Sequence, residues 1–231
     1  SAGDKIAIMM NNSREWVMFD QAAQGLGLVV VPVYTNDRPD NVAYILEDAE
    51  VKLLVLENMV QLNSFAEIKE HLSSLTRIIL VKPIDKDDSP VANAVSLSNW
   101  LPSEQASLVT TAIDKDTLAT MVYTSGTTGK PKGVMLSHRN ILANVYGALQ
   151  SVDVFEDDVF LSFLPLSHML ERMAGYYLPV ISGSSVAYSR SIPQLANDLL
   201  EIKPTVMVSV PRIFERVFAK IQDKLDKESA F

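Results

Sequence analysis

The sequence predicts an α/β fold, and two observations carry this prediction. Short apolar runs recur along all 231 residues, and segments with the spacing of amphipathic helices separate them. Strands that are buried on both faces have such runs, which are typical of mainly parallel sheets covered by helices. Hydrophobic residues at 48% and charged residues at 21% also fit a folded globular protein rather than a disordered one.

The bounds of each element are expected where an apolar strand-like run changes to a segment of helical period, or the reverse. Strands are expected over 5–10, 28–33, 51–56, 77–81, 118–124, 158–164, 184–189 and 205–210. The first helix is expected after Asn12 or Ser13 as N-cap, and the second over about 38–48. Further helices are expected after Ser137, Ser167, Ser191 and Pro211. The polar stretch 82–116 has no clear period and is expected to run over the surface.

Composition excludes several classes of function. The net charge of -8 argues against a nucleic-acid-binding surface. The absence of cysteine excludes disulfides, thiolate zinc sites and a cysteine nucleophile. The longest apolar runs are shorter than the ~20 residues of a membrane span, and the first residues lack a signal-peptide pattern. We therefore expect a cytoplasmic protein, and leave peripheral contact with a membrane surface and the oligomeric state open.

Acidic residues avoid one part of the chain. No Asp or Glu occurs between Asp116 and Asp153, although the whole chain has 28. Four basic side chains lie inside that gap: Lys130, Lys132, His138 and Arg139. The pattern favours an anion site, while chance clustering around a buried strand and helix is the alternative.

The stretch "YTSGTTGKPKG" at 123–133 follows the expected strand 118–124 directly. Its glycines permit close backbone approach, its hydroxyls donate hydrogen bonds, and its lysines add positive charge, as a phosphate chain requires. A hairpin turn is the alternative, because the Lys-Pro and Lys-Gly pairs suit turns. The spacing of Gly126 and Gly129, with Pro131 after Lys130, is not that of a Walker A loop and excludes a kinase-type phosphotransferase.

The longer segment "YTSGTTGKPKGVMLSHRN" resembles the phosphate-loop signature of the adenylate-forming superfamily, which includes acyl-CoA synthetases, luciferases and adenylation domains. The segment "FLSFLPLSHMLERMAGYY" resembles the next core motif, and "TVMVSVPRIFERV" is most similar to the long-chain fatty acyl-CoA synthetase branch. The resemblance implies part of a large domain with two mainly parallel sheets and helices between and outside them. It divides the chain into a first α/β subdomain at 1–136 and the start of a second at 137–231.

By this resemblance the protein activates a long-chain fatty acid. ATP with Mg²⁺ converts the acid to an acyl-adenylate, and coenzyme A then takes the acyl group. The resemblance assigns phosphate binding to Thr124, Ser125, Gly126, Thr127, Thr128, Gly129 and Lys132. It places Thr124 also near the magnesium ion, and it implies catalytic roles for Lys132 and His168. Lys130 stands at a variable position of the motif, so no role is carried over to it.

Several residues near 168 have simpler interpretations. His168 has two interpretations. By the resemblance it lies between the acyl carboxylate and the α-phosphate, and by its position alone it is a helix-start histidine bonded to the backbone. For Glu171 and Arg172 we expect an ion pair that orients the helix rather than catalysis. Five apolar side chains could line an acyl tunnel or belong to the core: Phe163, Met169, Met173, Tyr176 and Tyr177. His71 is expected on the exposed face of a helix.

The family's adenine, ribose and carboxy-terminal lysine motifs are not found in this sequence. The resemblance therefore implies the front part of a large domain that does not turn over alone. Two alternatives stay open: adenylation of another carboxylic acid, and a non-catalytic module that binds a nucleotide or a lipid.

Overall fold

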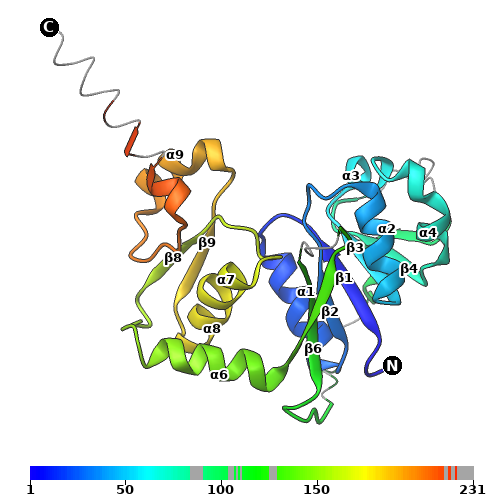
Figure 1. The fold of residues 1–231 in the computed structure, drawn as a ribbon, viewed down its shortest axis with the longest axis horizontal. Helices are drawn as coiled ribbons and strands as arrows, with labels where there is room; N and C mark the ends of the chain where they lie inside the picture. The colour runs from blue at the N-terminus through cyan, green and yellow to red at the C-terminus, as the bar shows by residue number, and fades with distance from the viewer. Residues whose placement is uncertain are drawn as a thin grey trace, which may run out of the picture.

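The structure is a computed structural model, and it describes residues 1–83, 91–103, 107, 109, 111–124, 129–215, 218, 219 and 222. A larger α/β unit contains the N-terminus, and a smaller unit built on two strands follows it (Figure 1). Helices α6, α7 and α8 lie between the two sets of strands (Figure 1). The α/β class that the sequence predicts is confirmed.

The larger unit is a seven-stranded sheet of strand order β5-β4-β3-β1-β2-β6-β7. Its strands are β1 (Lys5–Met9), β2 (Val29–Pro32), β3 (Val51–Leu56), β4 (Arg77–Leu80), β5 (Ala94–Ser96), β6 (Leu118–Thr124) and β7 (Lys132–Ser137). All neighbouring pairs are parallel except β6 and β7, which are antiparallel. The carboxyl ends of β2 and β6 therefore lie at the same edge of the sheet.

Both faces of this sheet are buried, because alternate residues of each strand enter different cores. On β1, Ala7 and Met9 pack with α2 and α4, whereas Ile6 and Ile8 pack with α1, α6 and η2. The helices are α1 (Arg14–Gly25), α2 (Pro39–Asp48), α3 (Met59–Asn63), α4 (Lys69–Ser74), α5 (Leu97–Trp100), α6 (His138–Leu149), α7 (Met169–Arg172), α8 (Leu178–Ser182) and α9 (Leu195–Ile202). Shorter turns are η1 (Ala66–Ile68), the π-helical η2 (Met173–Tyr177) and η3 (Ile192–Gln194). This double burial explains why the strands read as continuous apolar runs.

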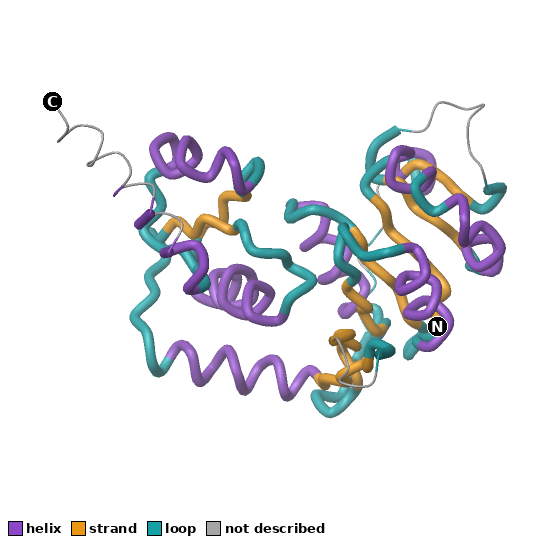
Figure 2. The backbone as a smooth tube through the Cα atoms, turned by 45° about the horizontal axis from the view of Figure 1, so that its top comes forward, coloured by secondary structure: helices purple, strands orange, loops and turns teal. Residues whose placement is uncertain are grey.

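The smaller unit contains β8 (Val159–Ser162) and β9 (Ser185–Tyr188), which are parallel. Val206 extends this pair by a single parallel bridge to Phe160. These strands lie apart from the larger sheet, with helices between them (Figure 2). The expected boundary between residues 136 and 137 falls one residue before the end of β7, and it stays a prediction.

The sequence predicts several helix starts at the residue where they occur. The Ser13 side chain caps α1 by accepting from the Trp16 N–H at 3.2 Å, and Ser137 caps α6 with Asn140 in a reciprocal capping box. The helix expected after Ser167 begins one residue later, with His168 as its N-cap. Residues 211–215 are helical, where the sequence predicts a helix after Pro211.

Other elements differ from the prediction. Strands β5 and β7 and helices α3 and α5 are not expected from the sequence, whereas α4 contains His71, which is expected in a helix. The expected strand 205–210 is reduced to the bridge at Val206. The described part of 82–116 contains β5 and α5, so it is more than a surface excursion. Strand β7 exposes much of its length, and its extended form follows from pairing with β6 rather than from an apolar run.

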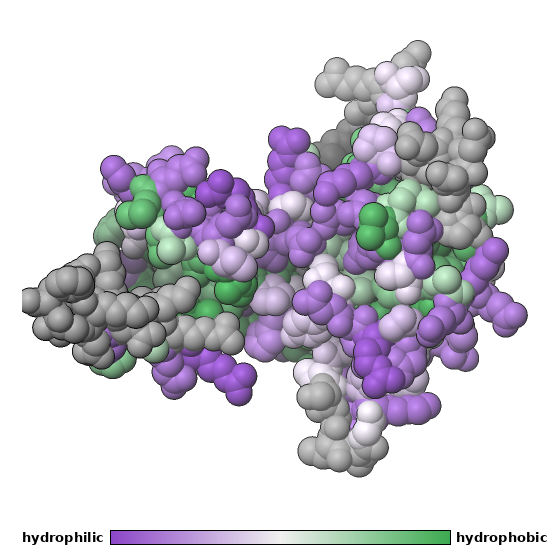
Figure 3. Space-filling view, turned by 90° about the horizontal axis from the view of Figure 1, so that it is seen from above, coloured by the Kyte–Doolittle hydropathy of each residue, from purple (hydrophilic) through white to green (hydrophobic). Residues whose placement is uncertain are grey.

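The surface of the described part is mainly hydrophilic, as expected for a folded globular protein. Hydrophilic residues cover most of the face drawn in Figure 3, and hydrophobic residues show in smaller patches between them. Among the described residues, no helix has both the length and the apolar character that crossing a bilayer requires.

The double-sided core gives a first prediction. We expect Leu54→Ala, which removes a fully buried side chain from β3, to lower the free energy of unfolding by about 2–5 kcal/mol because it leaves a cavity. Urea titration of this chain measures the change. Val60→Ala is the matched control, since Val60 is 80% exposed on α3, and we expect a change within about 0.5 kcal/mol. Equal losses in the two variants would contradict the packing described here.

Candidate functional site

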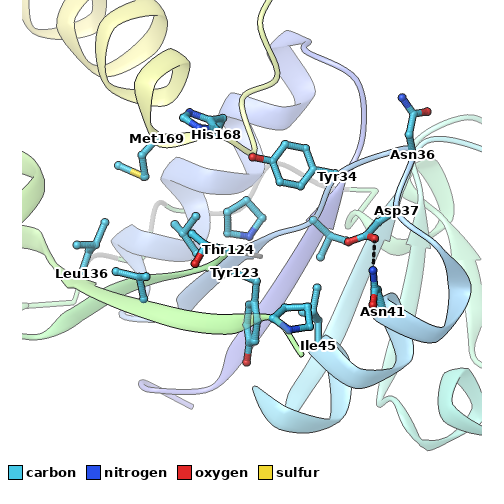
Figure 4. A pocket seen from close by; sticks show the side chains of 15 residues that line it. Tyr34, Asn36, Asp37, Asn41, Ile45, Tyr123, Thr124, Leu136, His168 and Met169 are labelled. Atoms are coloured by element: carbon cyan, nitrogen blue, oxygen red, sulfur yellow. Dashed lines mark hydrogen bonds between the residues drawn. The ribbon is translucent and has the colours of Figure 1, made fainter. Parts of the chain in front are cut away.

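A cleft of about 660 Å³ opens at the carboxyl ends of β2 and β6. Open α/β sheets bind ligands at this edge. The side chains that define the cleft are Tyr34, Asp37, Thr124, Leu136, His168 and Met169 (Figure 4). His168 and Met169 come from the start of α7 and lie across from Thr124 on β6 (Figure 4). Two regions that the sequence singles out, 44 residues apart, thus meet in one cavity.

Thr124 ends β6 and exposes its hydroxyl at the start of the glycine-rich turn. Ser125, Gly126, Thr127 and Thr128 lie outside the described residues, so their predicted phosphate contacts stay predictions. Gly129 has a φ of 100°, which an L-residue rarely adopts. After it the chain reverses into β7, so Lys132 is the ladder partner of Thr124.

The two lysines of the turn point in different directions. Lys132 is exposed beside Thr124 and does not line the cleft. Lys130 places its Nζ 4.8 Å from the centre of the Tyr44 ring, in a cation–π contact. The structure therefore brings Thr124 and His168 together in the cavity and leaves Lys132 at its rim.

Only these two of the four basic residues in the acid-free stretch flank the turn. His138 and Arg139 begin α6, after β7 has run back to the opposite edge of the sheet. Arg139 there donates to Asp116, with one of its two bonds at 2.6 Å. Only Lys130 and Lys132 of the acid-free stretch can therefore serve an anion site at the turn, because an antiparallel strand separates His138 and Arg139 from it.

The cleft also contains residues that the sequence analysis does not identify. Asp37 lines it after β2, and its Oδ1 accepts from the Arg38 N–H and from Asn41 Nδ2, each at 2.9 Å (Figure 4). The sequence does contain a signal for such residues, since polar residues directly follow the expected strand 28–33. Neighbouring parallel strands end at the same edge of a sheet, so these residues could have been placed beside Thr124.

Tyr123 fixes the close approach of β7 to β6. Its hydroxyl donates to Asp48 at 2.6 Å, and burial together with the Asp48 carboxylate raises the pKa of Tyr123 well above its ordinary value. Gly133 is its ladder partner, and a Cβ at that position would lie 3.1 Å from Tyr123 Cζ. Gly133 is thus required for packing against the Tyr123 ring.

His168 has the N-cap role that the sequence leaves open, while its role between the acyl carboxylate and the α-phosphate stays a prediction. Its Nδ1 accepts from the Leu170 N–H at 3.1 Å and so caps α7. The neutral ring must then carry its proton on Nε2. The ring is exposed and lines the cleft, so it offers a hydrogen-bond donor to whatever occupies the cavity.

Arg172 forms an ion pair, but with a residue far away in sequence. Its guanidinium pairs with Asp20 on α1, and both side chains are completely buried. Burial alone would lower the pKa of Arg172, but the Asp20 carboxylate together with Tyr177 and Tyr176 outweighs this effect and raises it. The expected pair between Glu171 and Arg172 is therefore wrong, because Arg172 turns toward α1 while its neighbour turns away.

Glu171 is buried without a hydrogen bond of good geometry to either carboxyl oxygen within the described part of the chain. Burial raises the pKa of Glu171 to about 7, and the neighbouring Ser162 side chain opposes this shift only in part. A Cβ on Gly175 would lie 2.3 Å from Glu171 Oε1, so the glycine makes room for the carboxyl group. Among the described residues, no group of three or more acidic or histidine side chains could hold a metal ion.

A second cavity of about 610 Å³ adjoins the cleft and is mainly apolar. Its walls are β7, α6 and the α7–η2 segment, and it shares Leu136 and Met169 with the cleft. Of the five side chains considered for an acyl tunnel, Met169 and Met173 line this cavity. Tyr176 and Tyr177 belong to the buried core, and Phe163 lines neither cavity. His71 lies exposed on α4, as expected.

A mainly parallel sheet with a glycine-rich turn at its carboxyl edge defines an α/β ligand-binding domain, and solved structures share this fold. ATP-bound MatB from Rhodopseudomonas palustris has a TM-score of 0.77 and 25% identity, over 94% of this chain and 41% of that one. The N-terminal domain of FACL13 from Mycobacterium tuberculosis has a TM-score of 0.75 and 23% identity, over 93% of this chain and 52% of that one.

The chain belongs to the family of AMP-binding enzymes, whose model matches residues 1–230. It is 36% identical to "Long chain acyl-CoA synthetase 6, peroxisomal" of Arabidopsis thaliana, over 95% of this chain and 32% of that protein. It is 31% identical to "Fatty acyl-CoA synthetase A" of Dictyostelium discoideum, over 98% of this chain and 35% of that protein. The chain thus spans about a third of the length of these relatives.

The environment of Glu171 gives a pH prediction. Its pKa of about 7 lies above the ordinary 4.5, so the folded chain holds a proton that the unfolded chain releases between these values. Stability is therefore full below pH 4.5 and falls as the pH rises through about 7. We expect Glu171→Gln to remove this fall, which is roughly 2 to 3 kcal/mol.

Urea titrations of this chain from about pH 5 to 8 measure the effect. Glu67→Gln is the control, because Glu67 is exposed and its neutralisation leaves the pH profile unchanged. A profile for Glu171→Gln that is parallel to that of the unmodified chain would show that Glu171 is not the titrating group.

Proposed function

We propose that this chain forms the phosphate-binding and acyl-binding part of an enzyme that activates a long-chain fatty acid with ATP and transfers it to coenzyme A. One observation carries the proposal. The cleft that contains Thr124 and His168 shares Leu136 and Met169 with the apolar cavity beside β7. The proposed site for the triphosphate, at Thr124 and His168, is thus adjacent to a cavity that suits a hydrocarbon chain.

The first step joins two anions. A carboxylate oxygen of the fatty acid attacks the α-phosphorus of ATP, the bond between this phosphorus and the bridging oxygen breaks, and pyrophosphate leaves with the electron pair. Donors that face the departing pyrophosphate lower the barrier most when they bind the transition state more tightly than the ground state. Thr124, the residues of the turn and Lys132 are proposed for this role.

His168 is proposed to bind the reacting groups from the opposite side of the cleft. Its Nδ1 is occupied by the Leu170 N–H, so the ring presents the Nε2 proton. A donor at this place can hold an oxygen of the carboxylate or of the α-phosphate. In the second step the sulfur of coenzyme A attacks the acyl carbonyl carbon, the bond to AMP breaks, and the thiol proton is lost to solvent.

Thr124 is the one described residue that we propose as a ligand of magnesium. Mg²⁺ keeps several water ligands and takes others from substrate phosphates, so it does not need a cage of protein carboxylates. When bound, the ion would neutralise charge on the phosphates.

Two other functions stay as alternatives. Another carboxylic acid could occupy the apolar cavity, and a module that binds a nucleotide or a lipid without chemistry would need the same cleft. ATP–pyrophosphate exchange by the full-length protein separates the enzyme from the module. The dependence of that exchange on the acid supplied distinguishes the substrates.

The turn gives a prediction for the full-length enzyme. We expect Lys132→Ala and Thr127→Ala each to lower the rate of pyrophosphate exchange about 100-fold, because each removes a donor to the developing charge, while fatty-acid binding stays nearly unchanged. Lys69→Ala, on the exposed face of α4, is the matched control and should have no effect. Unchanged exchange in both turn variants would remove these residues from the mechanism.

The apolar cavity gives a separate prediction. We expect Met173→Trp to narrow it and to lower the ratio of kcat/KM for palmitate over octanoate about tenfold, since the lost methylene contacts affect the longer acid most. Val180→Trp is the control, because Val180 is exposed on α8 and outside this cavity. A ratio that is the same in both variants would place the acyl chain elsewhere.

A further inference from the structure

The orientation of His168 depends on Arg172, which lies one helical turn after it. The Arg172 N–H donates to the His168 carbonyl oxygen at 3.0 Å, so the two residues belong to one turn of helix. α7, η2 and α8 follow one another without a break, so Met169–Arg172 is the first turn of a longer helical segment that ends at Ser182. Arg172 stands where this first turn passes into the π-helical turn, and its side chain leaves the segment toward the larger unit.

The Arg172 guanidinium binds two elements of the larger unit at once. One nitrogen pairs with Asp20 on α1, and Nη1 donates to Thr120 Oγ1 on β6 at 2.8 Å. The Thr120 hydroxyl in turn donates to the Val30 carbonyl oxygen of β2 at 2.6 Å. Thr120 lies on the same strand as Thr124, so one side chain links the turn behind His168 to the strand that ends in the candidate phosphate site.

The Asp20 carboxylate, which accepts from Arg172, has further hydrogen-bond donors around it. Asp20 Oδ2 accepts from the hydroxyls of Tyr176 and Tyr177 at 2.9 and 3.0 Å, and from Gln24 Nε2 at 2.7 Å. The π-helical turn η2 widens the helix directly after Arg172 and brings both tyrosines to the side of the guanidinium. The Trp16 ring lies 5.3 Å from the guanidinium carbon and restricts its position further.

Stability alone does not require such a network. A buried ion pair loses hydration at both charges, and apolar side chains of similar volume often stabilise a core as well or better. What apolar packing does not supply is a fixed direction, because hydrogen bonds from a planar guanidinium allow few orientations. The network therefore fits a role in orientation.

We propose that Arg172 is a positioning residue, which holds His168 in register with β6 through its bonds to Asp20 and Thr120. The proposal rests on the proposed adenylation function for its catalytic consequence. Its structural part, the fixed place of α7 relative to the larger sheet, stands on the contacts alone.

The hydroxyl of Thr120 offers the mildest test, in the full-length enzyme. Thr120→Val removes the acceptor on β6 but leaves the ion pair, and we expect kcat for pyrophosphate exchange to fall at least about tenfold with KM for ATP little changed. Thr120→Ser keeps the hydroxyl and should restore kcat. Equal kcat values in the two variants would overturn the proposal.

A paired variant separates positioning from stability. Asp20→Asn with Arg172→Met removes both buried charges but keeps an acceptor for the tyrosine hydroxyls. We expect this variant to unfold at a midpoint near that of the unmodified enzyme and to lose about 100-fold in kcat. Asp116→Asn with Arg139→Met removes an exposed pair of the same residue types and should retain full activity. If the buried-pair variant keeps both its stability and kcat within about threefold, the proposal is wrong.

If no acid supports pyrophosphate exchange, the proposed function is wrong and activity cannot report on positioning. A distance measurement then tests the structural part of the proposal. Spin labels on cysteines at Val60 of α3 and Leu170 of α7 report the place of α7 relative to the larger sheet. We expect a narrow distance distribution in the otherwise unmodified protein and a broader one with Asp20→Asn and Arg172→Met. An unchanged distribution would overturn the positioning role independently of activity.

Discussion

A fully buried guanidinium needs acceptors for its charge and its N–H groups, and the rest of this structure depends on where Arg172 finds them. Its two terminal nitrogens bind Thr120 and Asp20, whereas Nε has no hydrogen-bond partner in the described part of the chain. Its partners come from α1 and β6, so the chain beyond β7 must return to the face of the sheet that α1 covers. The same contact fixes the start of α7, and with it one wall of the cleft. Fold and site are therefore set by one interaction rather than by two independent sets of contacts.

Most strands could be predicted because they are buried on both faces. β1, β3 and β6 lie where their apolar runs lie, since most side chains of such a strand meet a core. β7 could not be predicted in this way, because it is an edge strand whose extended form comes from its partner. α3 and α5 are too short for a helical period to be evident in the sequence.

The site was only partly predictable for a related reason. Thr124 and His168 lie in motifs whose residue types suggest their chemistry, and both line the cleft. Asp20 and Arg172 are 152 residues apart, and neither has a neighbour in sequence that indicates the pairing. Single-sequence patterns describe local periods and turns, whereas a buried contact of this range depends on how the units pack together.

The N-cap bond of His168 has a consequence for the behaviour of α7. Nδ1 can accept from the Leu170 N–H only while it has a free lone pair. A rotation of the ring would turn Nδ1 away from the Leu170 N–H and would also redirect Nε2 in the cleft. The contact with a ligand and the integrity of the first helical turn are thus coupled through opposite edges of one aromatic ring.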